Sequence, residues 1–173
     1  MSSFAPSPLR RALLLAAVFT AAGCAKPEPS TQPRAITRET VCSLDGMTLA
    51  DYPGPKGQIV YAQGEPDFFC DTVELVAILL RPEQVRAIAG AYTQDMAATD
   101  WTQPLDHWID ARRAIYVVGS DAKGSMGPTL ATFARVEDAQ AFAARHGGQV
   151  LHFEQITPAM VNLDGGVLKD ERM

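Results

Sequence analysis

The sequence lacks the motifs that identify the commonest nucleotide-binding and hydrolytic domains. It contains no G-x-x-x-x-G-K-[ST] phosphate loop and no G-x-S-x-G nucleophile elbow. It has only three cysteines and three histidines, and no two cysteines form the C-x-x-C pair of a structural zinc site. These absences exclude P-loop nucleotide binding, an α/β-hydrolase triad and a zinc finger, and they leave the sulfur-bearing residues as the main candidates for chemistry.

Positive charge is also scarce. The chain has 15 Lys and Arg against 20 Asp and Glu, a net charge of −5. Removal of residues 1–23, which carry two arginines and no acidic residue, would leave 150 residues with 13 basic and 20 acidic side chains, a net charge of −7. Nucleic acids are bound mainly through neutralisation of their phosphates, so the composition argues against a nucleic-acid partner. The remaining length suits one ordinary domain or two small ones.

A long apolar run is missing as well. Residues 12–22 are apolar except for Thr20, and this stretch is much shorter than the roughly 20 residues that span a bilayer. It follows two arginines and ends in Ala-Ala-Gly directly before Cys24, which is the pattern of a bacterial lipobox. We therefore predict a lipoprotein signal peptide over residues 1–23 and a lipid-modified Cys24 whose acyl chains anchor the protein. Ala25 after the lipidated cysteine favours the outer membrane, with the protein facing the periplasm.

The segment after Cys24 is rich in proline and polar residues. Residues 25–34 read Ala-Lys-Pro-Glu-Pro-Ser-Thr-Gln-Pro-Arg and offer almost nothing to bury. Such a composition is typical of an extended or flexible linker. We predict a tether over residues 24–40.

A weak internal repeat predicts the architecture. β-Branched and aromatic residues predict strands, and i, i+3, i+4, i+7 apolar spacing predicts helices. The first half of the repeat has strands at residues 58–62, 66–69 and 87–96, with a helix at residues 71–81 that Pro82 ends. The second half has strands at residues 114–119, 129–134 and 149–153, with a helix at residues 136–145.

The predicted fold class is therefore α+β, with two packed ββαβ units. Alignment of Phe69 with Phe133 brings the two helices into register. The expected boundaries are residues 41–100 for the first unit, 101–157 for the second and 158–173 for a mobile tail. Trp101 and Trp108 are expected to pack where the units meet. Asp71 and Glu74 resemble a helix-capping box, and Gly147-Gly148 a helix stop.

Cys42 and Met47 form the strongest candidate site. They are five positions apart, and Asp45-Gly46 between them predicts a turn that would bring their sulfurs together. A thiolate and a thioether suit a soft cation, and Cu(I) is the first candidate. Met126, between Ser125 and Gly127, is a second candidate thioether.

Several segments together resemble the NosL family of nitrous oxide reductase accessory lipoproteins. The resemblance covers about residues 40–157. It rests on Cys42-Ser-Leu-Asp-Gly-Met47, Tyr52-Pro-Gly-Pro-Lys-Gly-Gln58, Ala91-Tyr92 with Asp95 and Trp101, Trp108-Ile-Asp-Ala111, Tyr116-Val-Val-Gly-Ser120, Ser125-Met126-Gly127 and Phe142 with Gly147-Gly148.

This resemblance implies a function and a ligand set. It implies two ββαβ units and a metallochaperone, not an enzyme, that takes Cu(I) from a copper donor. The copper would go to periplasmic nitrous oxide reductase or its assembly machinery. The implied ligands are Cys42, Met47 and Met126. Many members carry a second cysteine in a C-x-x-C-G-M pattern, and this chain has Asp45 there, so the ligand set would have to be completed by Met126, a histidine or a partner.

Three alternatives remain open from the sequence. Cys42 could form a disulfide with Cys70, because the predicted compartment is oxidising, and the protein would then be a metal-free scaffold that docks in an assembly complex. A third copper ligand could be a histidine. Of the three histidines, His107 is preferred over His146 and His152. The remote alternative is an enzyme like the organomercurial lyases, which use two cysteines and an acidic residue, here Cys42, Cys70 and Asp71. Apart from the disulfide, Cys70 at the predicted helix start is expected to be either a buried free thiol or a thiol of lowered pKa, and copper binding is not expected to need it.

Overall fold

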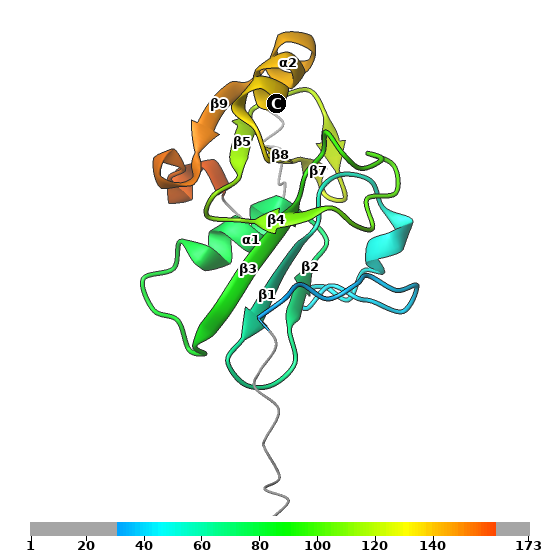
Figure 1. The fold of residues 1–173 in the computed structure, drawn as a ribbon, viewed down its shortest axis with the longest axis vertical. Helices are drawn as coiled ribbons and strands as arrows, with labels where there is room; N and C mark the ends of the chain where they lie inside the picture. The colour runs from blue at the N-terminus through cyan, green and yellow to red at the C-terminus, as the bar shows by residue number, and fades with distance from the viewer. Residues whose placement is uncertain (1–30, 162–173) are drawn as a thin grey trace, which may run out of the picture.

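The computed structural model describes residues 31–161, and they form two antiparallel sheets with one helix each, together with a separate two-stranded hairpin (Figure 1). The first sheet has the order β2-β1-β3-β4. Its elements are β1 (Gly57–Tyr61), β2 (Asp67–Phe69), α1 (Thr72–Leu79), β3 (Ile88–Gln94) and β4 (Trp108–Asp110). The second sheet has the order β8-β5-β9. Its elements are β5 (Ile115–Val118), β8 (Ala131–Phe133), α2 (Val136–His146) and β9 (Gln149–His152).

The two units share one topology, which confirms the predicted repeat. In each unit the first strand is central and pairs antiparallel with the second and the last strand. Phe69 and Phe133 each end the second strand and precede the helix by three residues. Gly147 and Gly148 end α2 with φ of 70° and 95°, a region that glycine enters without steric cost.

A shared core joins the units. It contains Ile59 and Leu75 of the first unit together with Tyr116 and Leu151 of the second, and each of these four residues is at most 5% exposed. Trp101 stacks on Phe142 of α2 with ring centroids 5.5 Å apart. The units therefore pack as a single body, as expected for pieces that are each too small for a core of their own.

Two strand pairs were not predicted. β4 lies beyond residue 101 but pairs with β3, so the division between the sheets falls between β4 and β5. A short hairpin, β6 (Lys123–Gly124) and β7 (Gly127–Pro128), interrupts the second unit between β5 and β8. Strands of two or three residues leave too little periodic pattern to be found from the sequence.

The described part of the expected tether lies on the domain, which corrects its predicted boundary at residue 40. The Arg34 N–H donates to Gln58 Oε1 at 2.7 Å, and Gln58 Nε2 donates to the Arg34 carbonyl at 3.0 Å. The Tyr92 hydroxyl donates to the Thr31 carbonyl, and Ile36 is buried. We call residues 31–36 the strap; it crosses the face of the first sheet that points away from α1 (Figure 1).

The predicted tail also begins inside the fold. Short 3₁₀ helices occur at Leu49–Asp51, Phe153–Gln155 and Pro158–Val161. The last of them packs on α1, and Val161 is 3% exposed. The signal peptide, Cys24 and residues 162–173 lie outside the described residues.

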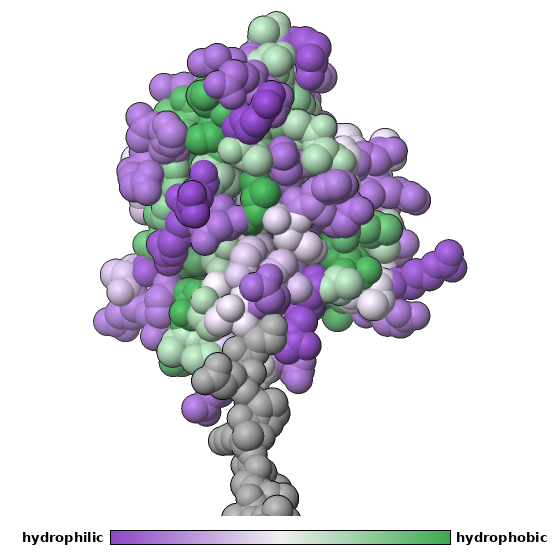
Figure 2. Space-filling view, in the orientation of Figure 1, coloured by the Kyte–Doolittle hydropathy of each residue, from purple (hydrophilic) through white to green (hydrophobic). Residues whose placement is uncertain are grey.

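Hydrophilic side chains dominate the face shown in Figure 2, with smaller hydrophobic areas between them. Among residues 31–161, no helix is both long enough and apolar enough to cross a membrane.

Candidate metal site

The predicted turn between Cys42 and Met47 is present. The Cys42 N–H donates to the Met47 carbonyl at 2.8 Å, and the Gly46 N–H donates to the Cys42 carbonyl at 2.9 Å. Gly46 has φ of +77°, which explains why glycine occupies this position. The Asp45 carboxylate accepts from the Met47 N–H at 2.9 Å. The loop is thus closed by its own backbone.

The same loop is attached to the edge of the first sheet. The Ser43 N–H donates to the Phe68 carbonyl at 2.8 Å, and Ser43 Oγ accepts from the Phe68 N–H at 3.1 Å. Phe68 belongs to β2, and Cys70 follows this strand directly. The attachment therefore brings Cys42 beside Cys70, although 28 positions separate them in the sequence.

Two cysteines and two carboxylates meet at this point. Sulfur and oxygen atoms of Cys42, Asp45, Cys70 and Glu74 all lie within 4.8 Å of one another. Glu74 Oε2 is 3.3 Å from the Cys42 sulfur and 3.5 Å from the Cys70 sulfur, and Asp45 Oδ2 is 3.7 Å from the Cys70 sulfur. We call these four residues the thiol cluster. Asp45 is exposed and the other three are buried, so Asp45 is the member of the cluster that reaches the surface.

The two thiols differ in acidity. The neighbouring Cys70 side chain, with backbone N–H groups of Cys70, Leu44 and Asp45, lowers the pKa of Cys42 against the effect of burial. The neighbouring Cys42 side chain, burial and the negative charge of Glu74 raise the pKa of Cys70 well above its usual range. The pair therefore loses its first proton from Cys42 and retains the second on Cys70. Both cysteines are free thiols in the structure.

The predicted thioethers lie at different distances from this cluster. Met47 is half-buried and packs in a small apolar group with Ile36, Cys42, Leu49 and Cys70. Met126 is 53% exposed at the tip of the β6–β7 hairpin. Its neighbour Ser125 donates a hydrogen bond to the Cys70 carbonyl at 2.5 Å. Both residues remain predicted ligands, one beside the sulfurs and one on an adjoining hairpin.

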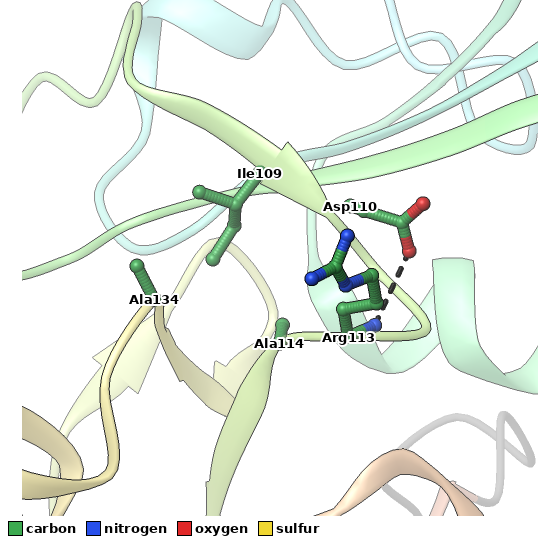
Figure 3. Close-up of a pocket in the computed structure, with 5 residues that line it drawn as sticks. All are labelled: Ile109, Asp110, Arg113, Ala114 and Ala134. Atoms are coloured by element: carbon green, nitrogen blue, oxygen red, sulfur yellow. Dashed lines mark hydrogen bonds between the residues drawn. The ribbon is translucent and has the colours of Figure 1, made fainter.

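The histidines are placed elsewhere. Within residues 31–161 the thiol cluster contains no histidine. His107 and His146 contact the carboxylates of Asp106 and Asp121 at 3.5 and 3.0 Å, and His152 precedes a 3₁₀ helix. A hollow of about 290 Å³ beside β4 is lined by Ile109, Asp110, Arg113, Ala114 and Ala134 (Figure 3). It offers no sulfur or imidazole, so the thiol cluster is the better soft-metal site.

The capping box at the start of α1 is only half formed. Asp71 is the N-cap, and its Oδ1 accepts from the Val73 N–H at 2.9 Å. Glu74 faces the two sulfurs instead of the cap. The acidic side chains beside the cysteines are therefore Asp45 and Glu74, and the Asp71 carboxylate of the lyase alternative binds Thr129 at 2.7 Å.

Sequence reasoning assigned no metal-binding role to Cys70, Asp45 or Glu74. Cys70 and Glu74 are four positions apart around a helix start, the spacing that places two side chains on one face. This spacing was a usable signal, but a capping box explained Glu74 equally well. Only the pairing of the loop with β2 shows that Cys42 joins them.

The fold and the site together define a small α+β protein that carries a buried dithiol with two carboxylates at the edge of its first sheet. The family model for NosL matches residues 33–161. The chain is 44% identical over 154 residues to a protein of Stutzerimonas stutzeri named copper-binding lipoprotein NosL, covering 87% of this chain and 80% of that one. A protein of the same name from Achromobacter cycloclastes is 39% identical over 160 residues, covering 88% and 82%.

A solved structure agrees with the sequence comparisons. The crystal structure of the copper chaperone NosL from Shewanella denitrificans has a TM-score of 0.70 and 40% identity, and the match covers 76% of this chain and 99% of that one. The chain belongs to the NosL family.

Proposed function

We propose that this protein is a membrane-anchored metallochaperone that binds Cu(I) and delivers it for assembly of the copper centres of periplasmic nitrous oxide reductase. The observation that carries the proposal is the thiol cluster, in which two buried thiols lie within 4.8 Å of each other and of the exposed Asp45 carboxylate. Two thiolates and nearby thioethers match the soft-ligand preference of Cu(I). Family relatives that are named copper-binding lipoproteins support the same cargo.

The proposed ligands are Cys42 and Cys70 as thiolates, with Met47 and Met126 as thioethers. The buried thiols would hold the cation, and weaker thioether bonds would exchange during transfer. The carboxylates of Asp45 and Glu74 accept hydrogen bonds from the thiols. Because copper binding requires deprotonated sulfur, these carboxylates are positioned to accept the protons that the thiols lose. Transfer would proceed from a copper donor to nitrous oxide reductase or its assembly machinery.

Anaerobic titration of the purified, reduced protein tests the copper site. We expect one Cu(I) per monomer, measured by competition with a chromophoric Cu(I) chelator, and loss of this binding in Cys42→Ser. Cys24→Ser in a non-lipidated protein is the matched control, since it removes a thiol outside the site. Unchanged Cu(I) binding in Cys42→Ser would contradict the site assignment.

The scaffold alternative makes a different prediction. A metal-free scaffold with a Cys42–Cys70 disulfide would show no free thiol among these two residues after isolation from the periplasm. The proposed chaperone would show both thiols free or copper-bound, as in the structure, where both are free. Thiol labelling followed by mass spectrometry separates the two functions.

The membrane anchor needs its own test. We propose that Cys24 carries the lipid and that the mature protein is attached to the outer membrane on its periplasmic side. Detergent phase partitioning and mass analysis of the wild type should show a lipidated protein in the membrane fraction. Cys24→Ala should remain unprocessed or appear in the soluble periplasmic fraction, and a wild-type protein without acyl mass would refute the anchor.

A further inference from the structure

Lys56 is a fully buried lysine close to the thiol cluster. Its side chain is 0% exposed, and its ammonium group donates to the Pro53 carbonyl and to Ser125 Oγ, each at 2.8 Å. Burial lowers the pKa of Lys56 to about 8, and the negative charges of the nearby carboxylates Asp71 and Glu74 counteract this effect. Removing an ammonium group from water costs several kcal/mol. An apolar side chain could fill the same space without this cost, so the charge requires an explanation.

The hydrogen bonds of Ser125 connect this ammonium group to the cysteine. A serine hydroxyl has one proton. Because Lys56 donates to Ser125 Oγ, the hydroxyl proton is available for the Cys70 carbonyl, to which Ser125 donates at 2.5 Å. The hydrogen bonds therefore run from the Lys56 ammonium group to the Ser125 hydroxyl and from that hydroxyl to the Cys70 carbonyl, which is the backbone acceptor of a proposed copper ligand.

Ser125 also fixes the hairpin that carries Met126. The hairpin backbone packs tightly against the start of α1. A Cβ at Gly124 would clash with Asp71 Oδ2, so there is no space for a side chain at this position. On the other side, the Trp101 indole donates to the Lys123 carbonyl at 3.0 Å. Met126 follows Ser125 directly and is exposed. The ammonium group of Lys56 thus contacts Ser125, whose hydroxyl links the Met126 hairpin to the Cys70 backbone.

We infer that Lys56 is a positioning residue of the copper site, which holds the Met126 hairpin against Cys70 and offsets the negative charge of the thiolates and carboxylates around the bound cation. The inference rests on the proposed Cu(I) function. Lys56 does not contact the metal. Its effect is transmitted through Ser125 and through the electric field, as for other outer-shell partners of metal ligands.

Lys56→Met removes the charge and keeps most of the side-chain volume. We expect the dissociation constant for Cu(I) to rise about 10- to 100-fold, the usual effect of losing an outer-shell partner. Lys123→Met is the matched control, because Lys123 is exposed on the same hairpin and should bind Cu(I) as the wild type does. Ser125→Ala should weaken binding in the same direction, and it decides the question if Lys56→Met does not fold in a thermal melt.

A double-mutant cycle distinguishes positioning from a general loss of stability. Met126→Ala should weaken Cu(I) binding in the wild type but should change it by less than about twofold in Lys56→Met, because the hairpin is already released. X-ray absorption spectra of the copper-loaded proteins should show one sulfur fewer in Lys56→Met than in the wild type. Additive effects of the two substitutions with an unchanged sulfur count would overturn the inference.

The outcomes also separate this inference from the proposed function. Failure of the wild type to bind Cu(I) would refute the function itself. Wild-type binding that depends on Cys42, together with wild-type affinity in folded Lys56→Met and Ser125→Ala, would refute only the role of Lys56.

Discussion

The dithiol predicts how copper affinity changes with pH. The raised pKa of Cys70 means that this thiol is protonated in the metal-free protein, so its proton must leave when a thiolate binds Cu(I). Cys42 has a lowered pKa, and its proton contributes only below that pKa. Affinity should therefore increase as the pH rises, and Cys70 should account for one proton of the dependence.

The magnitude follows from this one proton. Each proton released per metal ion changes the dissociation constant about tenfold per pH unit, or about 1.4 kcal/mol of binding free energy. Between pH 6 and pH 8 the contribution of Cys70 is about 100-fold. Cys70→Ser removes the ionisable group but keeps a hydroxyl donor beside the Cys42 sulfur, so its pH slope should be smaller than the wild-type slope by one, and its affinity at pH 7 should also be lower.

Competition with a chromophoric Cu(I) chelator at several pH values, without oxygen, measures both slopes. Thermal melts of both proteins over the same pH range serve as the control for folding. Equal slopes in wild type and Cys70→Ser would show that Cys70 keeps its proton when copper binds. The site would then consist of Cys42 with thioethers, as the sequence alone predicts.

Three further predictions concern the thioethers, the hairpin and the strap. Met47→Leu and Met126→Leu keep the side-chain volume, and each should remove one copper–sulfur contact from X-ray absorption spectra; an unchanged count would exclude that residue as a ligand. Gly124→Ala should lower the free energy of unfolding by about 1–3 kcal/mol, because its Cβ would lie 2.3 Å from Asp71 Oδ2; an unchanged denaturation midpoint would refute the tight contact. Gln58→Ala should accelerate hydrogen exchange of the Arg34 amide, because it removes Gln58 Oε1, which accepts a hydrogen bond from this amide at 2.7 Å. Unaltered exchange would mean that the strap is held by other contacts.

Much of the fold was predictable because it depends on local patterns. The strands centred on Ile59 and Tyr116 are dense in β-branched and aromatic residues, and α1 and α2 have helical spacing with Pro82 and Gly147 after them. The strap was not predictable. Its residues have the composition of a linker, and a distant side chain, that of Gln58, supplies the hydrogen bonds that hold it.

The candidate site was predictable only in part, for the same reason. The Cys42 loop closes through bonds within six residues, so the turn and its soft-metal character could be inferred from the sequence. The position of Cys70 could not, since it depends on a loop pairing with β2 across 25 positions. Local chemistry favoured a disulfide or an inert thiol for Cys70, and a cap for Glu74.

The sequence by itself determined the repeat of two ββαβ units, the resemblance to the NosL family and the sulfur pair Cys42 and Met47, because each is written in neighbouring residues. Tertiary structure alone decided that Cys70, Glu74 and Asp45 surround the Cys42 sulfur and that Lys56 is buried beside them. These contacts join segments far apart in the chain. Their energies depend on burial and charge, which exist only after the sheet edge, the loop and the hairpin have packed together.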